Sequence, residues 1–202
     1  MPDILSPIPS RAVFFDKDGV LNPDRGVHGF TAFTDFYPYV PAVIQRVRGL
    51  GYKTFIVTNQ PIVGRGLITE NQLCELFTEL FHKISAACPD AVFDGYQYCP
   101  HHPHADIIEY RADCTCRKPH PGMITDLAHA HCVNTQNSFM IGDRSSDITA
   151  GRLAGCTTIQ CLTGCENEPP IISSLSAKPM PADFTISDLN ELPELLKSLT
   201  VQ

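Results

Sequence analysis

The feature that most constrains this sequence is a regular alternation between short apolar runs of strand length and longer stretches whose apolar residues recur at helical spacing. Such alternation is typical of βαβ units, in which helices connect parallel strands. Most of the runs are apolar at successive positions, as expected for strands covered on both faces. The sequence therefore predicts a doubly wound α/β fold. The predicted strands are Arg11–Asp16, Lys53–Thr58, Phe93–Tyr98, Phe139–Gly142 and Thr157–Cys161.

Local signals place helices between these strands. Apolar residues at helical spacing predict a helix over residues 41–50 that ends at Gly51. Thr69 and Gln72 predict a capping box at the start of a second helix. Further helices are expected to begin at Pro121, to follow Asp143 and to lie near Glu191–Leu199.

The size and charge of the chain exclude several classes of protein. A length of 202 residues suits one domain, expected over residues 11–202 after a flexible leader of residues 1–10. No apolar stretch is long enough to span a bilayer, and no secretion signal is visible, so we expect a cytoplasmic monomer without a membrane partner. The formal charge of −7 and the absence of a Lys/Arg run argue against a nucleic-acid partner.

Two segments break the alternation. Residues 99–121 are rich in His, Pro and Cys, are too long for an ordinary connection and show no helical or strand period, so something other than an apolar core must order them. Residues 163–183 are rich in Pro and Ser and are expected to form an exposed loop.

Two carboxylates follow the first predicted strand. Asp16 and Asp18 are separated by one residue, and Gly19 allows the chain to turn away. Open α/β sheets bind ligands beyond the carboxyl ends of their strands, and in extended geometry both side chains point to the same side. Such a pair can divide phosphoryl transfer, because one carboxylate can attack phosphorus while the other protonates the leaving oxygen. A solvated acidic turn is the alternative interpretation of this fragment alone.

Polar groups with matching chemistry follow later strands. Thr58, Asn59 and Gln60 end the second predicted strand with a hydroxyl and two amides that can hold phosphoryl oxygens. Lys118 can neutralise a phosphoryl group, and Arg117 can bind a second anionic or hydroxyl group, although such a pair is also common on solvated surfaces.

A further acidic turn follows the fourth predicted strand. Asp143 is expected to bind Mg²⁺, which favours carboxylates together with water and phosphate oxygens. Asp147 is a second candidate, although a carboxylate in the first turn of a helix is also explained by capping and the helix dipole.

The ordered set Asp-x-Asp-Gly, Thr-Asn-Gln, Lys and Gly-Asp-x-x-x-Asp resembles the haloacid dehalogenase superfamily of phosphatases over residues 11–162. This resemblance implies a Rossmann-like parallel sheet with helices on both faces and a small loop-type cap. It also implies Mg²⁺-dependent hydrolysis of a phosphate monoester through an aspartyl-phosphate, because phosphoryl transfer depends mainly on positioning and charge neutralisation.

The resemblance assigns roles to particular residues. Asp16 would be the nucleophile and Asp18 the general acid that later activates water, with Thr58 and Lys118 as further catalytic groups. Magnesium would be bound by the Asp16 side chain, the Asp18 backbone carbonyl and Asp143.

Closely spaced cysteines in the irregular segment predict a structural zinc site that orders residues 99–116. Three thiols and an imidazole make a closed tetrahedral shell, which leaves no open position for catalysis. The expected ligands are Cys99, His101, Cys114 and Cys116, with His102 and His104 as rival histidines. Free thiols beside a surface histidine are the alternative. The remaining cysteines show no pairing pattern and are expected to be reduced: Cys74, Cys88, Cys132, Cys156, Cys161 and Cys165.

The run Cys-Pro-His-His-Pro followed by Cys-x-Cys-Arg-Lys-Pro-His-Pro-Gly-Met is similar to the D-glycero-D-manno-heptose-1,7-bisphosphate 7-phosphatases and, less closely, to histidinol-phosphate phosphatases. The resemblance implies removal of the 7-phosphate of the heptose in heptose-precursor biosynthesis, with histidinol phosphate or another small sugar phosphate as the alternative substrate. It implies substrate-binding roles for Asp24, Arg25, Gly26, Val27, Asn59, Gln60, Pro61, Arg117 and Arg144.

This sequence departs from the family pattern near the substrate. Arg144 replaces a usual lysine, residues 61–64 replace a common Ser-Gly-Ile-Ala, and Val27 stands where a tyrosine can occur. These departures bear on the choice of substrate and not on the nucleophile or the metal ligands.

Two readings from other classes make different predictions. A phospho-acceptor signalling domain places its acceptor aspartate after a middle strand, whereas here the Asp-x-Asp comes first and the middle strand ends in Thr58. A noncatalytic zinc-ordered binding module would not need acids and a lysine at several strand ends.

Overall fold

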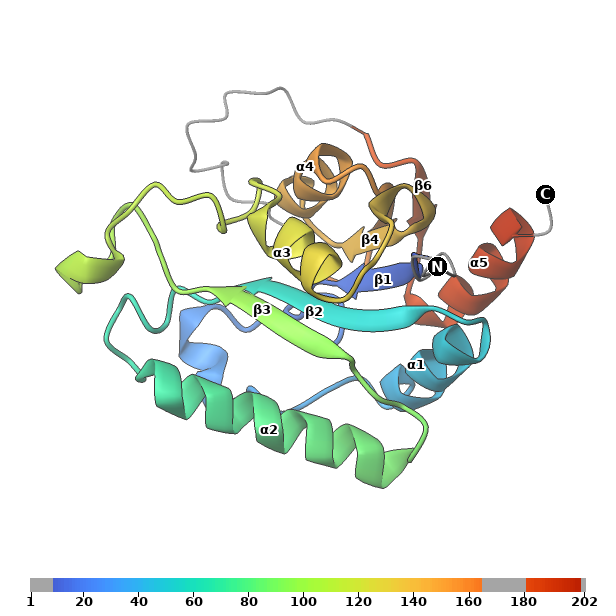
Figure 1. Ribbon diagram of the computed structural model, residues 1–202. Coiled ribbons are helices and arrows are strands. Elements are labelled where there is room, and N and C mark those ends of the chain that lie inside the picture. The colour runs from blue at the N-terminus through green and yellow to red at the C-terminus, as the bar shows by residue number, and fades with distance from the viewer. Residues whose placement is uncertain (1–8, 165–180, 201–202) are drawn as a thin grey trace, which may run out of the picture.

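The computed structural model describes residues 9–164 and 181–200. Its strands form one parallel sheet in the order β3-β2-β1-β4-β5-β6 (Figure 1). The strands are β1 (Ala12–Phe15), β2 (Lys53–Asn59), β3 (Gly95–Cys99), β4 (Phe139–Gly142), β5 (Thr157–Cys161) and β6 (Phe184–Ile186). The five predicted strands are thus confirmed, and β6 was missed because three residues are too short to show a period.

The strand order places a topological switch point at the centre of the sheet. From β1 the chain winds through β2 to β3 on one side, and β4 then returns to pair with the other edge of β1. In doubly wound sheets, ligands bind beyond the carboxyl ends of the strands at such a point. The predicted fold class is confirmed, and the crevice between β1 and β4 is where a site is expected.

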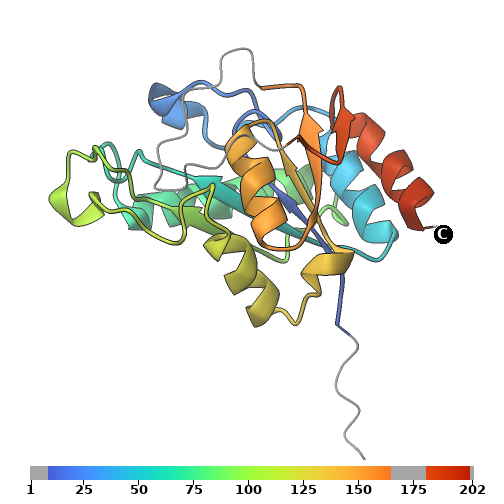
Figure 2. The same ribbon diagram turned by 90° about the horizontal axis from the view of Figure 1, so that it is seen from above.

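Helices cover both faces of the sheet, as Figures 1 and 2 show. Helices α1, α2 and α5 lie on one face, and α3 and α4 lie on the other. The predicted capping box at the start of α2 is present, because Thr69 Oγ1 accepts from the backbone N–H of Gln72 and the Gln72 side chain accepts from that of Thr69. The helices are α1 (Val40–Gly49), α2 (Glu70–Ala87), α3 (Gly122–Ala130), α4 (Ser145–Leu153) and α5 (Leu192–Thr200).

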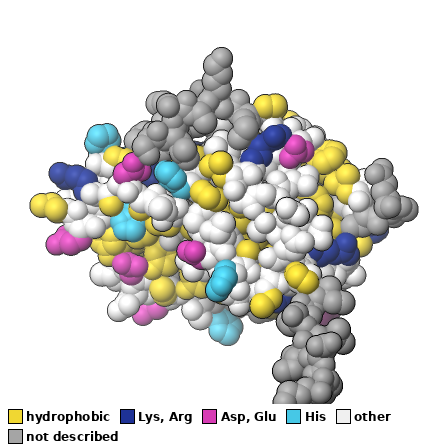
Figure 3. All heavy atoms as spheres, turned by 45° about the horizontal axis from the view of Figure 1, so that its top comes forward, with side chains coloured by type: hydrophobic (Ala, Val, Ile, Leu, Met, Phe, Trp, Pro, Cys, Tyr) yellow, Lys and Arg dark blue, Asp and Glu magenta, His cyan; other side chains and the backbone are white. Residues whose placement is uncertain are grey.

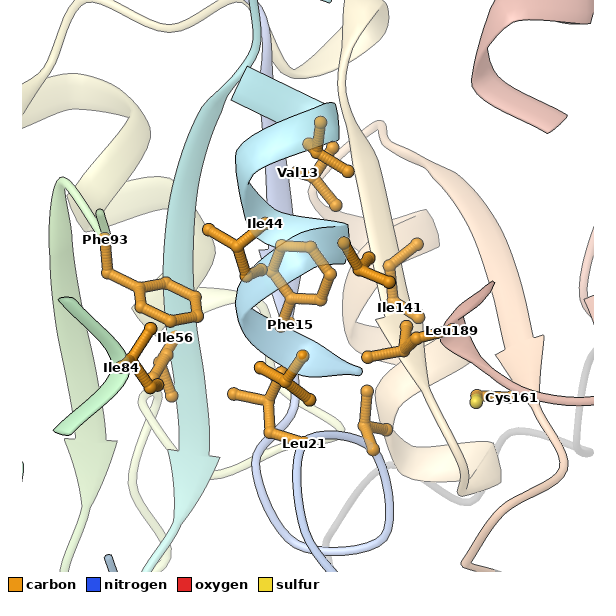
Figure 4. Packing of buried hydrophobic residues seen from close by; sticks show 14 of the residues in the cluster. Val13, Phe15, Leu21, Ile44, Ile56, Ile84, Phe93, Ile141, Cys161 and Leu189 are labelled. Carbon is orange, nitrogen blue, oxygen red and sulfur yellow. The ribbon is translucent and has the colours of Figure 1, made fainter. Parts of the chain in front are cut away.

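The central strand is buried on both faces. Val13 and Phe15 pack in a cluster with apolar residues of α1, α2 and α5, part of which Figure 4 shows. Ala12 and Phe14 point the other way and pack in a second cluster with residues of α3 and α4. Each fully buried Val, Leu, Ile or Phe side chain contributes about 1.5–3 kcal/mol. This packing fixes the carboxyl end of β1 from both sides.

The segment between β3 and α3 contains one short regular element, the 3-10 turn Ile108–Tyr110, which projects at the far left of Figures 1 and 2. The expectation that this segment lacks a long helix or strand is confirmed.

The chain ends differ in part from expectation. Residues 1–8 of the expected leader, residues 165–180 of the expected exposed loop, and Cys165 lie outside the described residues. Ser10, assigned to the leader, is hydrogen-bonded to the backbone of Cys132 and Asn134. The exposed-loop prediction is wrong for Thr163 and Gly164, which are half-buried, because the Thr163 hydroxyl donates to the Gly19 carbonyl over 2.6 Å.

None of the described helices combines the length and apolar character needed to cross a membrane. On the face shown in Figure 3, the coloured Lys and Arg side chains lie in separate spots rather than in one continuous basic area. This distribution agrees with the negative formal charge of the chain.

Candidate active site

The switch point brings two predicted acids together. Asp16 follows β1 directly and Asp143 follows β4 directly, and the backbone N–H of Asp16 donates to the Ile141 carbonyl over 2.8 Å. Asp147, in the first turn of α4, completes a buried group in which one carboxylate oxygen from each residue lies within 4.8 Å of the others. Adjacent parallel strands thus place residues far apart in the sequence at one edge of the sheet.

Lys118 is the cation of this group. Its Nζ lies 2.6 Å from Asp16 Oδ1 and 2.6 Å from Asp147 Oδ1, and it also donates to the Val57 carbonyl over 2.9 Å. Burial lowers the pKa of Lys118, but the carboxylates of Asp147 and Asp16 outweigh burial and raise the pKa above its usual value. Lys118 is therefore a charged ammonium group directed at the carboxylate that sequence analysis identified as the nucleophile.

Asp143 lacks the partners that a buried carboxylate normally has. The residue is fully buried, and neither of its oxygens has a hydrogen-bond partner among residues 9–164 and 181–200. Burial and the neighbouring Asp147 and Asp16 raise the pKa of Asp143 to about 8. Burial raises the pKa of Asp16 to about 7, because it outweighs the lowering effect of Lys118, and the charges of Asp147 and Asp18 act in the same direction as burial. Buried carboxylates of this kind require a cation or a proton.

Two glycines approach the Asp143 carboxylate so closely that neither can carry a side chain. A Cβ added to Gly19 or to Gly164 would overlap Asp143 Oδ2. Five carboxylates, those of Asp16, Asp18, Asp24, Asp143 and Asp147, face three cations, Lys17, Lys118 and Arg144, so full ionisation leaves two negative charges uncompensated. The donors are hard oxygens, so the group fits a divalent cation such as Mg²⁺.

Asp18 is held by donors that sequence analysis did not assign to it. Its Oδ1 accepts from Lys17 Nζ over 3.0 Å and from Asn22 Nδ2 over 2.9 Å, and its Oδ2 accepts from Gln60 Nε2 over 2.7 Å. Burial raises the pKa of Asp18, but the charge of Lys17 and these hydrogen bonds outweigh burial and bring the pKa below its usual value. Lys17 and Asn22 were missed, and the one signal was a lysine between two acids at the end of an apolar strand.

The residues at the carboxyl end of β2 support the site mainly through internal contacts. Thr58 is buried, and its hydroxyl accepts from Gln60 Nε2 over 3.1 Å. The Asn59 side chain is hydrogen-bonded to both the backbone N–H and the carbonyl of Lys118, over 3.0 and 3.1 Å. Asn59, expected at the substrate, thus fixes the backbone of Lys118, while Pro61 begins the following turn.

The predicted substrate residues before α1 lie around an ion pair. Asp24 pairs with Arg144, and its Oδ1 accepts from the backbone N–H of Gly26 over 2.8 Å. Arg25 is exposed and lies 3.8 Å from Asp35. The side chain of Val27 lies outside what the structure describes. Arg144 thus joins the Asp24 segment to the turn after β4, since its Nε is also 3.9 Å from Asp143 Oδ2.

The predicted zinc ligands form a second group at the end of β3. Cys99, Cys114 and Cys116 place their sulfur atoms 3.2–3.5 Å apart, and His101 Nδ1 lies 3.4 Å from Cys116 Sγ and 3.7 Å from Cys99 Sγ. His102 is not part of this group, because its Nδ1 accepts from the backbone N–H of His104. Three sulfurs and one imidazole nitrogen in this arrangement fit a tetrahedral metal site.

Arg117 lies between the two groups. Its Nη1 donates to the His101 carbonyl over 2.8 Å, and it is half-buried beside the cysteines. Burial lowers the pKa of Arg117 below its usual value. The prediction that Arg117 contacts substrate stays a prediction, because the structure shows its contact with the Cys/His loop.

Comparisons with known proteins agree with this geometry. A family model described as HAD-hydrolase-like matches residues 115–192. The D-glycero-beta-D-manno-heptose-1,7-bisphosphate 7-phosphatase of Salmonella typhi is 36% identical over 190 residues, which cover 92% of this chain and 95% of that protein. The protein of the same name from Pasteurella multocida is 33% identical, over 94% of this chain and 98% of that protein.

Solved structures share the fold. The D,D-heptose 1.7-bisphosphate phosphatase from B. bronchiseptica, complexed with magnesium and phosphate, superposes with a TM-score of 0.74 at 24% identity, over 94% of this chain and 99% of that one. A putative HAD-like phosphatase from Mesorhizobium loti gives a TM-score of 0.71 at 22% identity, over 96% of this chain and 88% of that one.

Proposed function

We propose that this chain, which belongs to the heptose bisphosphate phosphatase family of the haloacid dehalogenase-like hydrolases, removes the 7-phosphate of D-glycero-D-manno-heptose 1,7-bisphosphate. The observation that carries the chemistry is the buried group of Asp16, Asp143 and Lys118 at the switch point. Within the part of the chain that the structure describes, both oxygens of Asp143 lack a hydrogen-bond partner there. The substrate follows from the relatives, which match nearly the whole chain.

In the first half of the proposed reaction, a carboxylate oxygen of Asp16 attacks phosphorus. The new phosphorus–oxygen bond forms as the ester phosphorus–oxygen bond breaks, and Asp18 gives its proton to the leaving alkoxide. Lys118, 2.6 Å from Asp16 Oδ1, stabilises the negative charge of the transferring group.

In the second half, water attacks the aspartyl-phosphate. Asp18, now a carboxylate, takes a proton from the water, and the phosphorus–oxygen bond to Asp16 breaks to restore the free carboxylate and release phosphate. The three donors around Asp18 favour its ionised form through hydrogen bonds to both oxygens, and the ionised form is the one that can accept a proton from water.

The metal ligands we propose are the Asp16 side chain, the Asp18 backbone carbonyl and Asp143. Bound there, Mg²⁺ would reduce the repulsion between the anionic nucleophile and the anionic phosphate. We assign Asp147 a different role: its Oδ1 binds Lys118 and its Oδ2 accepts from the backbone N–H of Arg144, so it orients the lysine.

We propose that Cys99, His101, Cys114 and Cys116 hold a structural zinc ion. Such a closed shell of four ligands orders a loop without taking part in the chemistry. Its sequence position supports the proposal, since Cys116 lies two residues before Lys118 and a fixed Cys116 limits where Lys118 can lie.

A comparison of substrates tests the proposed function. Phosphate release would be measured with saturating Mg²⁺ for the α and β anomers of the heptose bisphosphate, for histidinol phosphate and for a hexose monophosphate. We expect the highest kcat/KM for a heptose bisphosphate, with ³¹P spectra showing loss of the C7 phosphate and retention of the C1 phosphate. A higher kcat/KM for histidinol phosphate would show that the proposed substrate is wrong. Failure to hydrolyse any of these esters with Mg²⁺ would refute the proposed activity.

A further inference from the structure

A buried lysine lies behind the proposed general acid. The Lys17 side chain is 1% exposed, whereas that of Asp18, its ion-pair partner, is 33% exposed. A buried ammonium group is costly unless it is paired and hydrogen-bonded. Among the described ion pairs, Lys17 forms one with Asp18 and with no other carboxylate. The roles proposed above use this cation only as one of the three donors to Asp18.

The position of Lys17 is fixed by groups other than Asp18. Its Nζ donates to Asn22 Oδ1 over 3.0 Å and lies 4.0 Å from the centre of the Phe33 ring. Phe33 is buried and follows the 3-10 turn Val27–Ala32. The lysine carbonyl accepts from the backbone N–H groups of Val20, Leu21 and Asn22, so both ends of the residue are held.

These contacts connect Asp18 to the segment that carries the predicted substrate residues. A small cavity of about 20 Å³ is lined by Lys17, Asp18, Phe33, Arg25 and Gly26, among others. Asn22 joins the same network twice, because its Nδ2 donates to Asp18 Oδ1 while its Oδ1 accepts from Lys17. A shift of Phe33 or Asn22 would therefore move Lys17 and, with it, the Asp18 carboxylate.

We propose that Lys17 is a positioning residue that holds the Asp18 carboxylate in place and makes that position depend on residues 22–33. The inference rests on the proposed function, because it assumes that Asp18 moves protons. Without Lys17, the carboxylate would keep only the two amide donors of Asn22 and Gln60, one on each oxygen. Displacing a catalytic group by about 1 Å can slow a reaction on the order of 100-fold.

The two halves of the reaction should respond differently to loss of this position. A sugar alkoxide needs a proton as it leaves, whereas p-nitrophenolate leaves without one. Attack of water on the aspartyl-phosphate needs Asp18 for either ester. A displaced Asp18 should therefore slow both halves with a sugar phosphate but only the second half with p-nitrophenyl phosphate.

The test compares Lys17→Met with Lys83→Met, a control at a half-exposed lysine that pairs with Glu79 on α2. With p-nitrophenyl phosphate, we expect Lys17→Met to keep a rapid burst of about one nitrophenolate per enzyme while steady-state turnover falls on the order of 100-fold. With the sugar phosphate, single-turnover cleavage should also slow, and KM should change little. Lys83→Met should behave as the unmodified protein.

A second variant guards against a failure of Lys17→Met to fold. Phe33→Leu removes the ring under the ammonium group and keeps every charge, and we expect the same separation of burst and steady state with a smaller loss, on the order of tenfold. Unchanged kcat in both variants, or an equal loss of burst and steady state, would overturn the role of Lys17. If the unmodified protein hydrolyses neither ester, the proposed function itself fails.

Discussion

The structure holds two groups of residues that could bind a metal, and they are built in different ways. In the carboxylate group, Asp16 and Asp143 follow two central strands that are packed on both faces, and Asp147 lies in the first turn of α4. In the Cys/His group, Cys99 ends β3, whereas His101, Cys114 and Cys116 lie on a segment whose one regular element is a three-residue turn. The first group is held by the packed sheet, whereas three ligands of the second are held by an irregular segment with a few hydrogen bonds.

Because of this difference, a metal ion in the first group would serve catalysis, and a metal ion in the second would serve folding. In the carboxylate group the sheet holds acids together against their mutual repulsion, so a cation there neutralises charge and can be exchanged. In the Cys/His group a bound metal would supply much of the free energy that orders the loop. The two are coupled through the chain, since Arg117 contacts His101 and is followed by Lys118 in the carboxylate group.

The largest effect is expected from a change in the carboxylate group. Asp16→Asn removes the nucleophile and should lower kcat on the order of 10⁴-fold or more, because the amide cannot form the phosphorylated intermediate. The midpoint of thermal unfolding should change little, since β1 is held by its core. An assay of phosphate release measures kcat, and thermal unfolding measures the midpoint. Retained turnover would show that another group attacks phosphorus.

A change in the Cys/His group should act in the opposite way. Cys114→Ser is expected to release the metal and lower the free energy of unfolding by about 2–4 kcal/mol, with a rise in KM because the loop carries Arg117 and Lys118. The control is Cys132→Ser, which removes an exposed free thiol. Metal analysis and chemical denaturation provide the measurement. Purified protein without zinc, or equal stability of the two variants, would contradict the comparison.

After Mg²⁺ is removed by dialysis, the carboxylate group should make the free energy of unfolding depend on pH. Burial raises the pKa of Asp16 to about 7 and of Asp143 to about 8, so the folded protein holds protons that the unfolded chain has lost above about pH 4. The free energy of unfolding should therefore fall as pH rises from about 4 towards 8. Mg²⁺ replaces these protons, so its stabilising effect should grow over the same range. Unfolding midpoints with and without Mg²⁺ that differ equally at every pH would refute this.

The smallest effect concerns a contact that supports the Cys/His segment without metal. Glu70, at the start of α2, accepts from Tyr98 over 2.6 Å and from Tyr110 over 2.7 Å. Hydrogen bonds from Tyr98 and Tyr110 lower the pKa of Glu70, so its stabilisation is present above the usual carboxyl pKa and is lost as pH falls below it. Glu70→Gln should cost about 1 kcal/mol at neutral pH.

The matched control for this contact is Glu75→Gln, an exposed glutamate of α2. Denaturation at neutral and acidic pH measures both variants, and the difference between Glu70→Gln and the unmodified protein should shrink in acid. A difference of the same size at both pH values would show that the glutamate charge does not hold the loop.

Local sequence patterns were enough to predict much of the fold. The strands, the Thr69 capping box and the Asp16 and Asp143 positions follow from apolar periodicity and from residues that end strands, which are properties of neighbours in the chain. The short β6 and the packing of Thr163 and Gly164 against the turn after β1 did not follow, because each depends on contacts with distant segments.

The sequence by itself therefore determined the class of fold, the acids at the strand ends and the cysteines of the loop, since side-chain chemistry and spacing depend on residues that are close together in the chain. Only the tertiary structure decided which groups partner them: that Asp147 and Asn59 hold Lys118, that Lys17 and Gln60 hold Asp18, and that His101 rather than His102 joins the cysteines. Such pairings depend on the order of strands in the sheet and on burial, which bring together residues that no local pattern connects.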